Sequence, residues 1–127
     1  MAHGLMLCDD LIFYSRVRGT AESLGGIITM VKTPSALVEM LRVNPAQCVI
    51  LDLQSPGLVI EEFVAELKRL TPELQIIGYG SHVEAETLRK ARAAGCDVVM
   101  PRSAFVLRLP LDLGVWMGLP GPTSAHP

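Results

Sequence analysis

The sequence predicts a doubly wound α/β domain, in which a parallel β-sheet is covered by helices on both faces. The chain of 127 residues contains five short apolar runs, and each is followed by a segment with helical periodicity. The runs are continuous rather than alternating, which is typical of strands buried on both faces. Alternating strands and helices join through right-handed crossovers and build a parallel sheet. A domain of this size buries enough surface to fold without disulfides or a structural metal.

The five apolar runs are the expected strands. They cover residues 4–8, 27–31, 48–51 running into Asp52, 75–79 and 97–100. Consecutive runs start 21 to 27 residues apart, a spacing that overlaps that of leucine-rich repeats. No L-x-x-L-x-L pattern recurs, and the helical segments are too long for such repeats. The sequence therefore favours the doubly wound sheet.

The first two expected helices follow the first two strands. The first has one apolar face and ends at Gly25; that face consists of Phe13, Val17, Ala21 and Leu24. The second begins at Thr33, a capping residue followed by Pro34 at the first helical position, and runs to about Val43. Both segments thus carry a recognisable signal at one end at least.

The third expected helix covers about residues 58–70, with Phe63, Leu67 and Leu70 facing inward. The fourth opens at residues 81–84, which have the spacing of a capping box, and ends at Gly95. The fifth is irregular: a single turn at residues 104–108 is expected, followed by a second helix from Leu109-Pro110 to about Met117. We expect one domain over residues 1–117 and a flexible tail over 118–127.

The composition excludes several classes of protein. Half of the residues are hydrophobic and 19% are charged, which excludes intrinsic disorder. The net charge of −2 leaves no basic stripe for nucleic acid. The three cysteines, Cys8, Cys48 and Cys96, are expected to be reduced thiols. No signal peptide or membrane span is visible, so we expect a cytoplasmic protein that contacts no membrane.

Three aspartates follow two of the expected strands. Asp9 and Asp10 end the first strand, and Asp52 ends the third. In a doubly wound sheet, ligands bind at the carboxyl ends of the strands where the strand order reverses. If strands one and three are neighbours, the three carboxylates converge there and repel one another. Such a cluster favours a hard divalent cation, above all Mg²⁺.

At this point the chain resembles the receiver domain of two-component response regulators, over about residues 4–117. Three motifs carry the resemblance: LMLCDD at residues 5–10, VILDLQSPG at 49–57 and AGCD at 94–97. The resemblance implies a flavodoxin-like sheet with strand order 2-1-3-4-5. It implies that Asp52 accepts a phosphoryl group, the only chemistry expected of this chain. It also implies that Mg²⁺ is held by Asp9, Asp10, Asp52 and the backbone carbonyl of Gln54.

Three positions of the pocket and switch depart from the receiver pattern, and Val59-Ile60 follow Pro56-Gly57 where the family usually continues with Asp-Gly. Gly80 stands where a receiver has Ser or Thr at the end of strand four, with Ser81 one residue later. Val99 stands where strand five has an aromatic switch residue, and Arg102 stands where a receiver has lysine. Arginine keeps the positive charge but is longer, planar and forked. The residues that transmit phosphorylation to the surface are therefore largely altered.

Each site residue also has an ordinary structural interpretation. Asp9-Asp10 could cap the first helix, because aspartate accepts free backbone N–H groups there. Asp52 could be an ordinary turn residue. Arg102 could be an ion-pair partner of the acidic cluster instead of a phosphate ligand.

Three functions remain open from the sequence. The first is a stand-alone receiver, phosphorylated on Asp52 with Mg²⁺ and served by a histidine kinase or phosphotransfer protein. The second is a phosphorylation-independent protein-interaction module with the same fold. The third and most remote is a flavodoxin-like protein that binds a small molecule. By resemblance, partners or a second copy dock on the fourth helix, fifth strand and fifth helix, and the candidate contacts are Arg89, Lys90, Arg92 and Val99.

Overall fold

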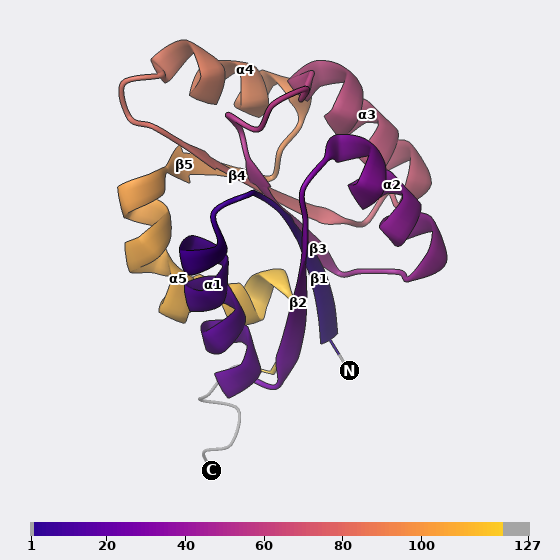
Figure 1. The fold of residues 1–127 in the computed structure, drawn as a ribbon, viewed down its shortest axis with the longest axis vertical. Helices are drawn as coiled ribbons and strands as arrows, with labels where there is room; N and C mark the ends of the chain where they lie inside the picture. The colour runs from indigo at the N-terminus through magenta and orange to yellow at the C-terminus, as the bar shows by residue number, and fades with distance from the viewer. Residues whose placement is uncertain (1, 121–127) are drawn as a thin grey trace.

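The computed structural model describes residues 2–120 and contains one parallel sheet between two helical layers (Figure 1). The strands are β1 (Ala2–Leu7), β2 (Gly26–Val31), β3 (Cys48–Asp52), β4 (Gln75–Gly80) and β5 (Val98–Pro101). The helices are α1 (Leu11–Ser23), α2 (Pro34–Val43), α3 (Ile60–Leu70), α4 (Ala85–Ala94) and α5 (Arg102–Trp116). Within residues 2–120, no helix is long and apolar enough to cross a membrane.

The strand order is β2-β1-β3-β4-β5, which confirms the order implied by the resemblance. All four strand pairs are parallel. At its last residue, Leu7, β1 pairs with Val31 of β2 on one side and with Leu51 of β3 on the other. The strand order therefore reverses at β1, because β2 lies on one side of this strand and β3 on the other. The segments after β1 and β3 consequently meet at one edge of the sheet.

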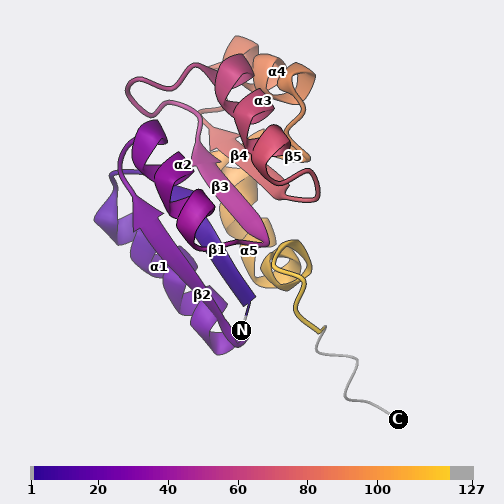
Figure 2. The same ribbon diagram turned by 90° about the vertical axis from the view of Figure 1, so that its right-hand side faces the viewer.

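Two cores lie on opposite faces of the sheet. Helices α2, α3 and α4 cover one face, and α1 and α5 cover the other (Figures 1 and 2). Along β1, Leu5 and Leu7 face the first core, whereas Met6 faces the second. All three are fully buried. This double burial explains why the strands are continuous apolar runs in the sequence.

Capping interactions stabilise three of the helix ends. The Asp10 carboxylate accepts a hydrogen bond from the Phe13 N–H and caps α1. The Thr33 hydroxyl accepts one from the Ala36 N–H, with Pro34 beginning α2 as expected. Gly95 ends α4 with a φ of 111°, a left-handed conformation that favours glycine.

The predicted capping box of the fourth helix is wrong. Helix α4 begins only at Ala85, and its N-cap residue, Glu84, makes no side-chain capping bond. The Ser81 hydroxyl accepts a hydrogen bond from the Val83 N–H, and the Ser81 carbonyl accepts one from Glu84. These bonds form a turn before the helix, so the serine supports the loop after β4.

The predicted break in the fifth helix is also wrong. Helix α5 continues from Arg102 to Trp116 with Pro110 inside it. Its buried face holds the helix against the sheet despite the lost N–H donor; that face consists of Phe105, Leu109, Leu113 and Trp116. Trp116 is 5% exposed and stacks on Phe105, so it belongs to the core. Most of the predicted tail, residues 121–127, lies outside the described residues.

Candidate functional site

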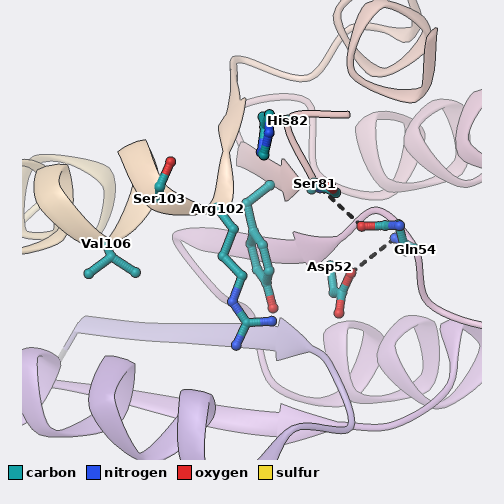
Figure 3. Close-up of a pocket in the computed structure, with 9 residues that line it drawn as sticks. Asp52, Gln54, Ser81, His82, Arg102, Ser103 and Val106 are labelled. Carbon is teal, nitrogen blue, oxygen red and sulfur yellow. Dashed lines mark hydrogen bonds between the residues drawn. The ribbon is translucent and has the colours of Figure 1, made fainter. Parts of the chain in front are cut away.

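A cavity of about 570 Å³ opens at the carboxyl edge of the sheet. Figure 3 shows its labelled side chains, with Asp52 from β3, Gln54 from the loop that follows and Arg102 from the start of α5. The full lining is Asp52, Gln54, Tyr79, Gly80, Ser81, His82, Arg102, Ser103 and Val106. The edge identified from the sequence is therefore the edge that carries the cavity.

Asp52 is half-buried at the end of β3. Its Oδ1 accepts a hydrogen bond from the Gln54 N–H at 3.0 Å. Burial raises the pKa of the Asp52 carboxyl above its ordinary value, and the charges of Asp9 and Asp10 act in the same direction. The Gln54 N–H and the Arg102 guanidinium act against this rise without cancelling it. Asp52 is thus a pocket residue with a destabilised negative charge.

Asp10 uses both carboxylate oxygens within the protein. Oδ1 accepts the Phe13 N–H at 3.0 Å, and Oδ2 accepts a guanidinium N–H of Arg102 at 3.0 Å. The Phe13 N–H, followed by Arg102, lowers the pKa of Asp10 below its usual value. Two of the three structural interpretations from the sequence are confirmed here, since Asp10 caps α1 and Arg102 is an ion-pair partner.

Arg102 is held on a second side by an aromatic ring. Its guanidinium carbon lies 3.9 Å from the centroid of the Phe13 ring. Phe13 is itself buried, with the rings of Tyr79 and Phe105 at 5.1 and 5.9 Å. A planar guanidinium suits both stacking on a ring and pairing with a carboxylate.

Gln54 enters the site through its side chain. The Gln54 Oε1 accepts a hydrogen bond from the Ser81 N–H at 3.0 Å, which links the loops after β3 and β4 (Figure 3). Gly80 precedes this contact, and a Cβ placed there would lie 3.5 Å from Leu88 Cδ2. This is ordinary van der Waals contact, so space is not the reason for the missing hydroxyl side chain.

Tyr79 is the site residue that the sequence analysis missed. It is 1% exposed, and among the described residues its hydroxyl has no hydrogen-bond partner. Burial raises the pKa of this hydroxyl, and the nearby charge of Asp52 raises it further. Tyr79 pairs with Asp52 across β3 and β4. The available signal was a phenol near the end of a strand whose other buried residues are apolar.

The acidic residues, as arranged, do not fit a magnesium ion. Asp9 is exposed, and Asp10 is engaged by Phe13 and Arg102. In the part of the chain that the structure describes, no group of three or more His, Cys, Asp or Glu residues is placed to hold a metal. The magnesium site, including the Gln54 carbonyl, stays a prediction, and one oxygen of Asp10 is already paired with Arg102.

The predicted basic partner surface is largely neutralised by carboxylates. Arg89 pairs with Glu86 on the same helix, and Lys90 lies 3.9 Å from Glu61 of α3. Arg92 approaches the backbone carbonyl of Val99 at 3.5 Å. Val99 is itself half-buried. These residues do cluster around α4 and β5, but they present little unpaired positive charge.

An apolar stripe runs along the outer side of α5. Leu107, Leu111 and Val115 are 74%, 67% and 73% exposed. They are spaced four residues apart and therefore share one face of the helix. Leu109, Leu113 and Trp116, on another side of the same helix, are buried in the core.

No family model matches this chain, and no curated protein does either. Several solved structures match the chain. A receiver domain protein from Clostridium thermocellum is 17% identical with a TM-score of 0.78, over 93% of this chain and 95% of that one. A CheY-like receiver domain protein from Methanospirillum hungatei is 14% identical with a TM-score of 0.79, over 93% and 94%. A LuxR family DNA-binding response regulator from Silicibacter pomeroyi is 21% identical with a TM-score of 0.73, over 93% of both. The chain therefore has the fold of the response regulator receiver domain.

Proposed function

We propose that this chain is a receiver-like signalling module that docks a protein partner through α5, without phosphoryl transfer to Asp52. The observation that carries the proposal is the exposed stripe of Leu107, Leu111 and Val115. Single exposed apolar side chains are common, but a contiguous row on one helix face marks an interaction surface.

The stripe fits a partner that presents an apolar helix face. Residues at i, i+4 and i+8 form a ridge that packs into the groove of another helix. Arg108 and Asp112 lie next to the ridge and pair at 2.9 Å, which supplies a polar rim. Residues 121–127, GPTSAHP, contain no large apolar side chain that could cover the ridge.

A second copy of this chain is a weaker candidate for the occupant. Stable protein interfaces bury about 800 Å² on each partner. Three side chains on one helix provide much less than this area. Transient signalling contacts bury less area than stable ones, so we assign the stripe to a transient contact with a different protein.

The hydrogen-bond donors around Asp52 support the phosphorylation-independent form of the proposal. Gly80 brings no hydroxyl group to the pocket. The Ser81 N–H donates to Gln54, and Arg102 donates to Asp10. A phosphoryl group on Asp52 would have to displace these internal partners before it gained charge-assisted hydrogen bonds.

One observation favours the alternative of a phosphorylated receiver. The Asp52 carboxylate lines the open cavity, and no ion pair involves it in the described residues. In that case a histidine kinase or phosphotransfer protein would be the partner. The two forms differ in whether Asp52 is needed for docking.

The test is capture of the partner by tagged full-length chains from an extract of the source organism. The set consists of the native chain, Leu111→Asp, Asp52→Asn and a control, Val43→Asp. Val43 is a matched control because it is 73% exposed on α2, far from the stripe in sequence. We expect the same protein in the native, Asp52→Asn and Val43→Asp samples, and at least a tenfold loss with Leu111→Asp.

Two results would count against the proposal. Equal capture by Leu111→Asp would remove α5 from the interface. Loss of capture with Asp52→Asn would make the pocket a controlling element and favour the phosphorylated receiver. Sedimentation of the purified native chain tests the remaining alternative, a second copy of this chain. A dimer that is lost in Leu111→Asp would assign the stripe to a contact between two copies.

A further inference from the structure

We infer that the Arg102 guanidinium is a built-in cation of the acidic site and that it blocks divalent metal binding at Asp10 in the native chain. The inference concerns the edge of the sheet where the fold family places a metal ion. It depends on no property of the α5 stripe.

The first argument is the use of the Asp10 oxygens. One oxygen accepts the Phe13 N–H and the other accepts the Arg102 guanidinium, both at 3.0 Å. The first bond belongs to the cap of α1 and is fixed by the backbone. A metal ion bound to the second oxygen would therefore lie beside the positively charged guanidinium.

The second argument is the way in which Arg102 is positioned. It is the first residue of α5 and directly follows Pro101, which pairs with Gly80 at the end of the sheet. Its guanidinium lies 3.9 Å from the Phe13 ring centroid, so the ring holds one side while Asp10 binds another. Cation–π contact and ion pairing together favour one orientation of a side chain that is 46% exposed.

The third argument is electrostatic. The Arg102 charge lowers the pKa of Asp52 as well as that of Asp10, so it stabilises the negative charge of two of the three clustered aspartates. A divalent cation beside Asp10 would lie within a few ångströms of the guanidinium. Repulsion at such a distance lowers its affinity by roughly tenfold or more, even when water screens the charges.

The test measures Mn²⁺ binding to the full chain from the electron paramagnetic resonance signal of free Mn²⁺. The variants are Arg102→Met and Arg108→Met. Arg108 is a matched control because it forms another exposed Arg–Asp pair, with Asp112 at 2.9 Å, away from the cavity. We expect Arg102→Met to bind Mn²⁺ at least tenfold more tightly than the native chain, and Arg108→Met to behave like the native chain.

Two further variants locate the effect. Adding Asp10→Asn to Arg102→Met should abolish the gained binding. Arg102→Lys keeps the charge but loses the planar fork, so its gain should be smaller than that of Arg102→Met. Circular dichroism checks the fold of each variant, and Arg102→Lys provides the comparison if Arg102→Met does not fold.

The inference is overturned if the native chain binds Mn²⁺ as tightly as Arg102→Met. It is also overturned if neither arginine variant at position 102 gains affinity, because Arg102 would then not be the obstacle. Persistence of the gained binding after Asp10→Asn would place the ion elsewhere and would likewise refute the assignment. None of these results bears on docking through α5, so the two proposals fail separately.

Discussion

Replacing Tyr79 with phenylalanine is expected to stabilise the protein. The Tyr79 side chain is 1% exposed, and its hydroxyl has no hydrogen-bond partner in residues 2–120. The substitution removes only this oxygen and leaves the ring between Phe13 and Phe105, at 5.1 and 5.0 Å. No cavity larger than one atom is created, so the main change is the loss of an unsatisfied polar group.

The magnitude follows from the cost of burying such a group. An unpaired buried hydroxyl costs about 1–3 kcal/mol, and the lower end suits a hydroxyl at the rim of a cavity. We therefore expect Tyr79→Phe to raise the free energy of unfolding by ~1 kcal/mol. For a domain of this size, that change raises the melting temperature by roughly 3–5 °C.

The assay is thermal unfolding followed by circular dichroism at pH 7, with Tyr14→Phe as the matched control. The Tyr14 hydroxyl donates to the Ile28 carbonyl at 2.6 Å. Removing it forfeits a hydrogen bond and should lower the free energy of unfolding by ~1 kcal/mol. The same chemical change in two tyrosines should thus shift the melting temperature in opposite directions.

A lower melting temperature for Tyr79→Phe would refute this reasoning. The Tyr79 hydroxyl would then have a partner in solution, such as Asp52 or a buried water molecule. The hydroxyl would in that case be a stabilising feature of the cavity, and the raised pKa of Asp52 would need a different balance of causes.

Three other substitutions test separate parts of the structure. The pKa of the Asp52 carboxyl is raised in the folded chain, so the unfolded chain loses this proton at a lower pH. The free energy of unfolding therefore falls as the pH rises from the unfolded pKa to the folded one. Asp52→Asn should lack this fall and be the more stable chain at pH 7. The same dependence of melting temperature on pH in both chains, from pH 3 to pH 7, would contradict the shift. Gly80→Ser should change stability by less than ~1 kcal/mol in urea unfolding, since its Cβ meets Leu88 at 3.5 Å; a larger loss would mean that the space is absent. Asp97→Ala should cost about 1–2 kcal/mol in the same assay, because Ile76 N–H and Lys68 Nζ lose their acceptor at 2.7 and 2.9 Å; an unchanged midpoint would show that water replaces it.

The sequence was sufficient to predict the strands, because each strand is buried on both faces and leaves a continuous apolar run. The predicted boundaries differ from those of β1 to β5 by at most two residues. The helix boundaries were harder to predict, because capping, turn formation and packing compete there and the hydrophobic pattern does not show which of them prevails. Ser81 has the chemistry of a helix cap but supports a turn. Pro110 has the chemistry of a helix breaker, but packing of the buried face of α5 outweighs it.

The candidate site was predictable where the backbone alone brings residues together. Strand order places Asp10 and Asp52 at one edge of the sheet, and both lie there. The pairing of Arg102 with Asp10 was one of two open interpretations, and only the direction of the arginine side chain decides between them. Tyr79 was missed because a tyrosine in a strand is ordinarily a core residue. Its missing hydrogen-bond partner becomes visible only in three dimensions.

The most direct test of the central claim is the intact mass of the chain after incubation with acetyl phosphate and Mg²⁺. The native chain and Asp52→Asn are compared under conditions in which an ordinary receiver domain reacts. We expect no added phosphoryl group on either chain, because the Ser81 N–H and the Arg102 guanidinium, which would stabilise it, already donate to Gln54 and Asp10. One phosphoryl group on the native chain and none on Asp52→Asn would contradict a phosphorylation-independent module.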